Sequence, residues 1–309
     1  MRKTFITTLT ELARKDEDIM LLTGDLGFSV FEDFAKEFPD RFINCGVMEQ
    51  SMMSIAAGLA LSGKKPYVYS IIPFATMRPF EQIRNDIAYQ NTNVKIIGVG
   101  TGFAYGPLGS THYAIEDIAI LRSLPNIAVI SPADSVETKA LILQTYKKTG
   151  PAYIRLLKPE TVLVPPKVKT VISKPSVVSH GKDGAIITTG AQLETGIAVA
   201  KKLKEKGYHM KLISMHTLKP VDQKTFVGII KNQKHIFTIE EHRLAGGLAS
   251  IVAELLFKIK GKMPRLQTFG VDDTYPGITG HQHYLASYHG LDTEKIYKKI
   301  INYLKKNGE

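Results

Sequence analysis

The glutamate at position 49 is the residue of this sequence whose surroundings best suit acid–base chemistry. It opens the segment Glu49–Leu61, whose other residues are apolar, small or uncharged. A glutamate at the start of a helix ordinarily stabilises the helix dipole and the first backbone N–H groups. Because no further charge follows, we predict a buried helix, and burial raises the pKa of a carboxyl group. Such a carboxyl group can hold or exchange a proton at neutral pH.

Two more polar residues stand where loops are expected. His112 follows the segment 109–111 (GST), which is typical of a loop at a sheet edge, where functional groups commonly lie. Asp25 follows the apolar run Ile19–Leu22, and it either contributes to a site or caps the next segment. His112 is therefore a candidate site residue, and Asp25 keeps both interpretations.

Short apolar segments alternate with segments of helical periodicity in the first half of the chain. The apolar segments contain continuous apolar runs, as strands that are buried on both faces do. This alternation predicts an α/β fold with a parallel sheet flanked by helices. The predicted strands are Ile19–Leu22, Lys65–Ile72, Val94–Val99 and Ile127–Ile130, and the predicted helices are Glu49–Leu61, Arg78–Tyr89, Ile115–Ser123 and Ser135–Lys147.

A second alternating unit follows a segment that is rich in proline. Residues 158–182 show little helical periodicity, which is typical of a linker with some extended structure. We therefore predict two α/β domains, at residues 1–160 and 183–309, with a linker at 161–182 and the smaller domain second. The later predicted strands are Ala185–Thr189, Met210–Met215, Lys234–Ile239 and Arg265–Gly270, and the helices are Leu193–Lys206, Leu248–Phe257 and Thr293–Leu304.

The composition indicates a globular protein and excludes several kinds of site. The chain has 44% hydrophobic and 22% charged residues, which argues against disorder. Its single cysteine, Cys45, excludes an intrachain disulfide and a zinc site built from several cysteines. The first residues lack the apolar core of a signal peptide, and no apolar run is as long as a membrane span. These features predict a soluble, cytoplasmic protein without a membrane partner.

The net charge of +11 raises the question of an anionic partner. The lysines are dispersed, with mild clusters at 201–206 and 298–306 on predicted surface helices. No basic stretch is interleaved with aromatic residues, and tryptophan is absent. We therefore predict no nucleic-acid partner; a basic nucleic-acid-binding module has only the net charge in its favour.

Several motifs resemble one family. The run Gly46-Val47-Met48-Glu49-Gln50 resembles the signature of the thiamine-diphosphate enzymes of the transketolase group. The collinear segments 74–86, 109–122, 125–134 and 150–155 resemble the same group, and the segment 240–248 resembles its carboxy-terminal domain. The chain thus looks like the carboxy-terminal half of a transketolase, with a pyrimidine-binding domain followed by the small terminal domain.

The resemblance implies roles for residues on the coenzyme side. Glu49 matches the catalytic glutamate, which donates a hydrogen bond to the aminopyrimidine ring nitrogen of thiamine diphosphate. Phe74 or Phe80 stacks on the pyrimidine. The match to the family around Arg78 can be shifted by one residue, and we favour Phe74. The implied coenzyme-binding residues are Asp25, Leu26, Glu49, Phe74, Arg78 and Phe80.

The resemblance also implies a substrate side. His112 matches an active-site histidine that contacts substrate oxygens near the reacting carbon. Arg2, Ser29 and Lys158 match groups that hold the terminal phosphate of the substrate, although the family commonly has arginine where Lys158 stands. These residues imply a phosphorylated or otherwise anionic substrate. Because a lysine binds phosphate as a point charge, we expect it to hold the phosphate in a less fixed orientation than an arginine would.

Three positions depart from the family pattern. An acidic pair that precedes the histidine is replaced by Pro107 and Leu108, and a histidine on the phosphate side is replaced by Gly100. An apolar side chain cannot pair with a sugar hydroxyl. Leu108 therefore favours a donor with fewer hydroxyl groups than the ordinary pentose phosphates.

The half of the family's site that binds the diphosphate is missing from this sequence. That half normally carries Gly-Asp-Gly and a later asparagine, which hold the diphosphate and a Mg²⁺ or Ca²⁺ ion; here Gly24-Asp25-Leu26 is the nearest approach. The resemblance therefore implies that the chain is inactive alone. We expect an N-terminal diphosphate-binding transketolase subunit as partner, in an α2β2 heterotetramer.

The resemblance leaves several functions open. The expected function is transfer of a two-carbon ketol or acyl unit from a ketose or 2-oxo-acid donor to an aldehyde acceptor. The alternatives are the β subunit of a 2-oxo-acid dehydrogenase, a deoxyxylulose-phosphate-synthase-like enzyme that uses pyruvate, and a non-catalytic assembly partner. The cluster of Glu240, Glu241 and His242, with His281 and His283 later in the chain, suggests a metal site, but we assign none because the family uses this domain for packing.

Overall fold

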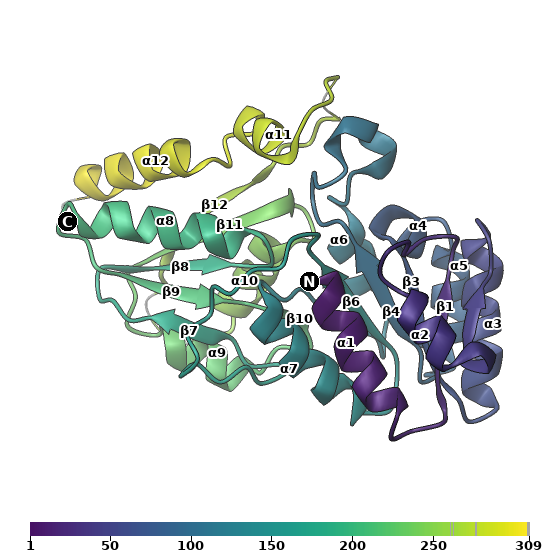
Figure 1. The fold of residues 1–309 in the computed structure, drawn as a ribbon. Coiled ribbons are helices and arrows are strands. Elements are labelled where there is room, and N and C mark those ends of the chain that lie inside the picture. The colour runs from purple at the N-terminus through teal and green to yellow at the C-terminus, as the bar shows by residue number, and fades with distance from the viewer. Residues whose placement is uncertain (260, 262, 276, 308–309) are drawn as a thin grey trace.

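Two sheets, each flanked by helices, lie side by side in the computed structural model (Figure 1). The structure describes residues 1–307 except 260, 262 and 276. This arrangement confirms the predicted α/β fold. Among the described helices, none combines the length and the apolar character needed to cross a membrane.

The first sheet has seven strands, and all but one of its pairings are parallel. In spatial order they are β10 (Thr217–Lys219), β5 (Ala128–Ile130), β6 (Ala152–Leu156), β4 (Lys95–Val99), β3 (Lys65–Ile71), β1 (Ile19–Thr23) and β2 (Phe42–Asn44). The exception is β10, which arrives from the second half of the chain and pairs antiparallel with β5.

Helices cover both faces of the first sheet. The helices α1 (Arg2–Ala13) and α7 (Ser135–Tyr146) contact each other on one face (Figure 1). The other face carries α3 (Glu49–Leu61) and α6 (Asp117–Arg122), which pack on a second apolar cluster. The shorter elements are α2 (Glu32–Glu37), η1 (Pro39–Arg41), α4 (Ile72–Thr76), α5 (Phe80–Gln82), η2 (Ile83–Tyr89), η3 (Gly106–Leu108) and η4 (Ser110–His112).

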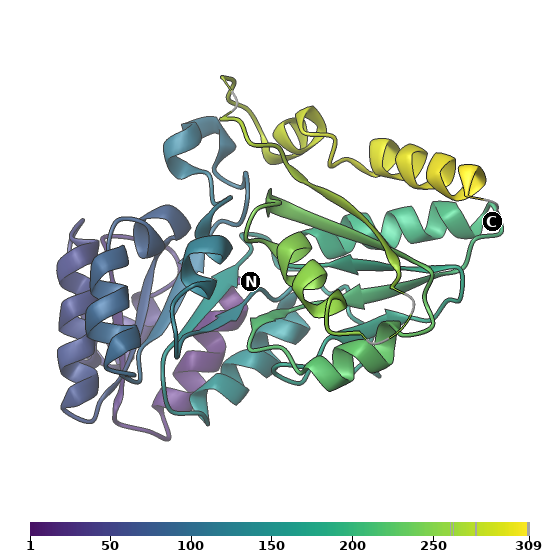
Figure 2. The same cartoon turned by 180° about the vertical axis from the view of Figure 1, so that it is seen from behind.

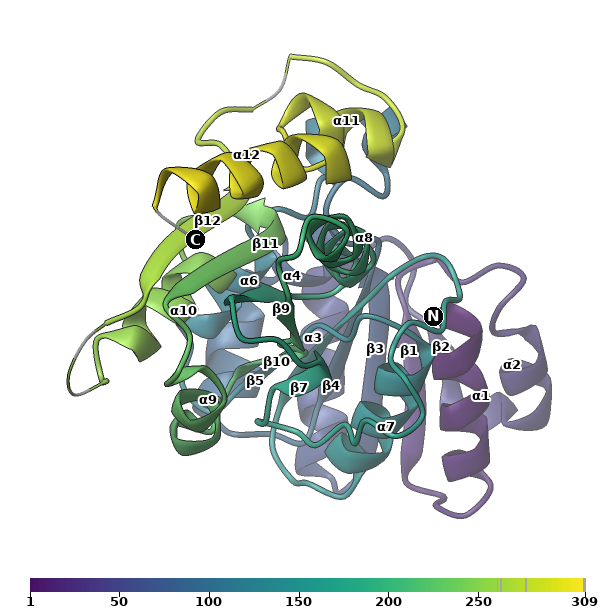
Figure 3. The ribbon, with the colours of Figure 1, turned by 90° about the vertical axis from the view of Figure 1, so that its left-hand side faces the viewer.

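The second sheet has five strands and is also mostly parallel. In spatial order they are β12 (Arg265–Val271), β11 (His235–Arg243), β8 (Gly184–Thr188), β9 (Met210–Ser214) and the antiparallel β7 (Ser176–Ser179). The helices are α8 (Gln192–Lys204), α9 (Gln223–Ile230), α10 (Leu248–Leu256), α11 (Gln282–Tyr288) and α12 (Thr293–Lys306). Figure 2 shows α9 and α10 on one face of this sheet, and Figure 3 shows α8 and α12 on the other.

The two halves of the chain share one apolar core. The cluster beneath α3 and α6 continues into side chains of the second half, including Ile187, Met215 and Leu218. A buried ion pair reinforces the boundary, because Arg155 of β6 binds Asp117 and also donates to the backbone oxygen of Glu241. The site on the first sheet is therefore supported by both halves.

Several predicted elements need correction. The segment Arg78–Tyr89 is not one helix: a turn over residues 77–79 precedes α5, and the remainder is the π-helix η2, because Pro79 cannot donate a helical hydrogen bond. The strands β2, β6, β7 and β10 were not predicted. Buried Arg155 and Lys95 interrupt the apolar pattern of β6 and β4, and partners in the folded chain compensate both charges.

Candidate active site

The candidate residues gather at the carboxyl ends of the parallel strands of the first sheet. Asp25 follows β1, Phe74 and Arg78 follow β3, and Lys158 follows β6. In open α/β sheets this edge is where ligands bind, because loops from neighbouring strands form a crevice there. The topology thus brings together residues that are far apart in the sequence.

Glu49 lies at the first position of α3, and only 1% of its surface is exposed. Its Oε2 accepts a hydrogen bond from Nη1 of Arg78 at 2.6 Å, and its Oε1 accepts one from Oγ of Ser70 at 3.3 Å. Gly24 leaves room beside it, since a Cβ on that residue would stand 3.4 Å from Oε1. The carboxylate is therefore held from two sides within a cradle that lacks side-chain bulk.

The prediction of a fully buried α3 is wrong for one of its faces. Met52, Met53 and Ala56 are buried, whereas Ile55 is 42% exposed and Gly58 faces open space. A helix without charged residues can leave one face exposed in the isolated chain if another protein surface covers that face in an assembly. The ion pair with Arg78 was also not predicted, and a guanidinium at this distance stabilises the ionised carboxylate against the effect of burial.

A ring cluster adjoins the Glu49–Arg78 pair. The Arg78 guanidinium lies 4.5 Å from the ring centroid of Phe74, and the rings of Phe74 and His112 meet edge to face at 5.0 Å. Burial lowers the pKa of His112, which favours the neutral imidazole. Phe80 instead packs against the apolar cluster beneath α3. The structure thus places Phe74 beside His112 and Phe80 in the packing of the helix.

Tyr105 connects His112 with the predicted anion-binding residues. Its ring lies 6.5 Å from that of His112, and the Lys158 ammonium stands 3.7 Å above its centroid. Nζ of Lys158 also donates to the backbone oxygen of Ala104 at 3.2 Å. Burial and the nearby Arg2 lower the pKa of Lys158, so the two cations face the same region. Tyr105 was missed in the sequence, where the signal was a pair of aromatic residues, Phe103 and Tyr105, inside a glycine-flanked loop.

The remaining candidates lie in the loop after β1. Asp25 has a φ of 55°, its N–H donates to Oδ1 of Asn44 at 3.0 Å, and its Oδ1 accepts from Nδ2 of Asn44 at 3.1 Å. The backbone oxygen of Leu26 accepts from Oγ1 of Thr23. The N–H of Ser29 donates to Glu32 at 2.6 Å. This loop is stabilised mainly by its own contacts and those to β2.

Large apolar side chains are exposed around this group. Phe28 is 72% exposed beyond the loop after β1, Val47 and Met48 are exposed just before Glu49, and Leu108 is 57% exposed before His112. We call these four residues and Ile55 the apolar rim. Contiguous exposed apolar surface commonly marks an interaction site.

The acidic and histidine cluster of the second domain has structural roles. Glu240 accepts hydrogen bonds from the N–H groups of Leu248 and Ala249 at the start of α10. Burial lowers the pKa of His242 to about 4, which keeps its ring neutral. Over the residues that the structure describes, no three His, Cys, Asp or Glu side chains are arranged to hold a metal ion.

The fold and the site define an α/β protein with a buried glutamate, a ring cluster and a cationic end at one sheet edge. Residues 1–162 match the family described as "Transketolase, pyrimidine binding domain", and residues 173–296 match "Transketolase, C-terminal domain". The chain belongs to the transketolase family. Enzymes of this family depend on thiamine diphosphate.

Individual relatives match nearly the whole chain. A putative transketolase C-terminal section of Methanocaldococcus jannaschii is 38% identical, over 99% of this chain and 96% of that protein. One of the subunits of an apulose-4-phosphate transketolase of Phocaeicola vulgatus is 37% identical, over 99% of this chain and 97% of its own length. A solved split-gene transketolase, described as an inactive beta4 tetramer, superposes with a TM-score of 0.87 at 34% identity and covers 98% of this chain and 97% of its own. This chain is thus similar in extent to separate transketolase subunits.

Proposed function

We propose that this chain is the pyrimidine-binding subunit of a thiamine-diphosphate-dependent transferase that moves a two-carbon unit to an aldehyde acceptor. The observation that carries the proposal is the buried Glu49 carboxylate at the edge of the first sheet: its partner Arg78 lies over the ring of Phe74, and that ring meets the ring of His112. A buried carboxylate next to an aromatic ring suits a flat, nitrogen-containing heterocycle, since one group can hydrogen-bond the ring edge and the other can stack on its face. The residues present therefore fit the pyrimidine half of the coenzyme.

The coenzyme, when bound, supplies a nucleophilic carbon that accepts the two-carbon unit. Glu49 holds a proton at its carboxyl group and donates it in a hydrogen bond to the pyrimidine ring nitrogen. Phe74 would stack on the pyrimidine ring, and Asp25 and Leu26 would contribute to holding it. His112, neutral because of its partial burial, hydrogen-bonds substrate oxygens near the reacting carbon.

Arg78 must release Glu49 for this role. In the present structure Oε2 of Glu49 is bound by Arg78, so that oxygen is not free to hold a proton for a ligand. The Arg78 side chain is 41% exposed, which leaves space for it to turn away from the carboxylate. We infer that the ion pair belongs to the isolated subunit and opens when coenzyme binds.

The cationic end suits an anionic substrate. Arg2 and Lys158 face the same region, and Lys158 forms no salt bridge within the described part of the chain. A cation that is held by a ring face and a backbone oxygen keeps its charge available for an anion. Ser29 lies in the loop after β1, and it would reach the anionic group only from there. We therefore assign Ser29 the weakest contribution to binding the anionic substrate.

A partner subunit completes the proposed site. The apolar rim borders the Glu49 region and exposes side chains that a second chain would cover. We propose that this chain pairs with a diphosphate-binding subunit, which holds Mg²⁺ or Ca²⁺, and that two copies of each form a heterotetramer. The relatives described as separate sections and subunits support this organisation.

Reconstitution tests the proposal. The chain is co-expressed with a diphosphate-binding transketolase subunit and supplied with thiamine diphosphate, Mg²⁺, a ketose phosphate and an aldehyde acceptor. Transfer of a two-carbon unit that requires both chains is expected. A complex that binds the coenzyme but transfers no unit from any ketose or 2-oxo acid would support the assembly-partner alternative.

Leu108 favours a second candidate donor. Its exposed apolar side chain lies before His112, where a hydroxyl-rich donor would need a polar partner. A 2-oxo acid such as pyruvate has no sugar hydroxyls to satisfy. Comparing pyruvate with xylulose 5-phosphate in the reconstituted complex separates the two donors, and Leu108→Asp is expected to raise the relative rate with the ketose.

A further inference from the structure

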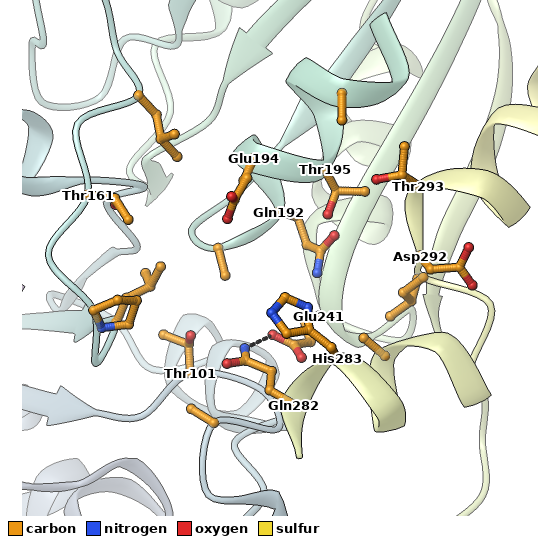
Figure 4. A pocket seen from close by; sticks show the side chains of 18 of the residues that line it. Thr101, Thr161, Gln192, Glu194, Thr195, Glu241, Gln282, His283, Asp292 and Thr293 are labelled. Carbon is orange, nitrogen blue, oxygen red and sulfur yellow. Dashed lines mark hydrogen bonds between the residues drawn. The ribbon is translucent and has the colours of Figure 1, made fainter. Parts of the chain in front are cut away.

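A hollow lies between the two halves of the chain (Figure 4). It encloses about 510 Å³, which is within the range of small-molecule sites. Thr101 and Lys158 line it from the first sheet, whereas Thr195 of α8 and Thr293 of α12 line it from the second domain. Glu49 and the ring cluster do not belong to its lining, so it is separate from the proposed coenzyme site.

The base of this interdomain hollow carries a buried carboxyl group. Glu241 is almost fully buried, and its oxygens accept from Nε2 of Gln282 at 2.7 Å and from the N–H of Phe103 at 3.4 Å. Burial raises the pKa of Glu241 to about 7. A carboxyl group with this pKa changes to its ionised form readily when a cation approaches.

A buried amide with spare capacity stands above Glu241. Gln192 of α8 reaches into the hollow and is 5% exposed (Figure 4). Within the part of the chain that the structure describes, its side-chain oxygen has no hydrogen-bond partner. A buried polar atom without a partner is costly, and a bound molecule with a donor group would satisfy it.

Acidic side chains outnumber basic ones in the lining of the hollow, although the chain as a whole has a net charge of +11. Glu294 pairs with Lys202 at 2.6 Å, and Asp292 caps α12 and pairs with Lys295 at 3.5 Å. Glu194 forms no salt bridge among the described residues, so its carboxylate is available to a ligand. Lys158 lines the same hollow on the side of the first sheet.

We propose that this interdomain hollow binds a small organic molecule that carries both a primary amine and hydroxyl groups, such as an amino sugar. Its ammonium group is attracted by Glu241 and Glu194, and its hydroxyl groups match the side chains of Thr101, Thr195 and Gln192. The hollow shares Lys158 with the proposed substrate end, but binding of the amine by Glu241 and Glu194 needs neither the coenzyme nor the partner subunit.

Calorimetric titration of the isolated chain at neutral pH tests this site with three probes: glucosamine, glucose and N-acetylglucosamine. We expect glucosamine to bind with a Kd of about 1 mM or lower, as suits a ligand of its size. Glucose and N-acetylglucosamine should bind more weakly because neither has a free amine. Glu194→Gln should weaken glucosamine binding about tenfold, since it removes a charge-assisted hydrogen bond.

Two further variants locate the binding. Ala198→Phe places a ring in the hollow from the middle of α8 and should abolish the binding of glucosamine. Glu205→Gln, on the C-cap residue of α8 and outside the lining, is the matched control and should bind as the unaltered chain does. Unchanged thermal midpoints show that each variant folds. If Ala198→Phe does not fold, Glu194→Gln still tests the site, because Glu194 is exposed and its replacement should not disturb packing.

Three outcomes overturn the proposal. The first is no glucosamine binding at concentrations about tenfold above the expected Kd. The second is equal affinity for glucosamine in the unaltered chain and in Glu194→Gln. The third is binding of N-acetylglucosamine as tight as that of glucosamine, which would show that the carboxylates do not select the amine.

Discussion

At the scale of single residues, the site depends on which groups face Glu49. The carboxylate is buried and is bound by Arg78 and Ser70, while Gly24 keeps the adjacent space open. Arg78 occupies one oxygen of the carboxylate, so a ligand that binds this oxygen has to displace Arg78.

Replacing Glu49 by glutamine tests its proton-holding role. Glutamine keeps the shape and can donate a hydrogen bond, but it cannot exchange a proton, so turnover of the reconstituted complex should fall about 100-fold or more. Coenzyme affinity should change less. The control is Glu81→Gln, which alters an exposed carboxylate near the same loop. Unchanged turnover in Glu49→Gln would remove Glu49 from the mechanism.

Gly100 provides a second test at this scale. Its φ is +89°, and a Cβ there would stand 2.1 Å from Cε2 of Tyr105, so the histidine that transketolases carry at this position does not fit. We expect Gly100→Ala to lower the free energy of unfolding by about 1–3 kcal/mol, because strain and overlap combine.

A double-mutant cycle separates these two causes. In a Tyr105→Ala background the overlap is gone, so Gly100→Ala should cost less there, and the difference measures the contact. Denaturant unfolding of the four proteins supplies the values. If the two changes in unfolding free energy are additive in the double variant, Tyr105 does not exclude a side chain at Gly100.

At the scale of elements, α7 connects the first sheet with the segment that leads to the second domain. Its N-cap residue Asp134 accepts from the N–H of Glu137 at 2.8 Å and from the N–H groups of Leu163 and Val164 at 2.7 Å each. Asp134 is thus the N-cap of α7. One carboxylate thus caps a helix and anchors a later loop.

Glu137 makes the stability of this region depend on pH. Burial raises its pKa from 4.5 to about 7, so the folded chain keeps a proton that the unfolded chain loses above pH 4.5. Its contribution therefore becomes less favourable as the pH rises from 4.5 to 7, and it levels off above that. Glu137→Gln lacks this titration. Between pH 4.5 and pH 7 its unfolding free energy should therefore rise by at least about 1 kcal/mol relative to that of the unaltered chain.

Equilibrium unfolding of both proteins across this pH range measures the difference. The buried histidines make both proteins more stable as the pH rises. Comparing the two proteins at each pH cancels this shared contribution to the unfolding free energy. A constant difference between the two proteins would show that Glu137 titrates as an exposed glutamate does.

At the scale of the whole molecule, the chain exposes large apolar side chains near the proposed coenzyme site. The apolar rim consists of residues from the loops beside Glu49 and His112 and of Ile55 on the exposed face of α3. The two sheets share a core, and β10 binds the second half to the first sheet. The rim is therefore presented by a rigid support.

Assembly can be tested through one rim residue. We expect the co-expressed chains to sediment as an α2β2 heterotetramer and Ile55→Lys to weaken the assembly at least about tenfold, because a buried unpaired ammonium is costly. The control is Phe257→Lys, which changes an exposed apolar residue next to α10. Separated monomers at micromolar concentrations of the unaltered pair would contradict the proposed assembly.

Local patterns in the sequence were enough to predict the class of fold, the span of α3 and the family. Continuous apolar runs identify buried parallel strands, and the motif around Glu49 is local, so both can be recognised without knowledge of distant contacts.

The groups that face one another could be identified only in the folded chain. The contact of Arg78 with Glu49, the place of Tyr105 over Gly100, and the strand β10 in the first sheet all join residues that are distant in the sequence or separated by loops. Periodicity reports which face of an element is apolar, but it does not report what covers that face. For this reason the sequence predicted neither the exposed face of α3 nor the interdomain hollow.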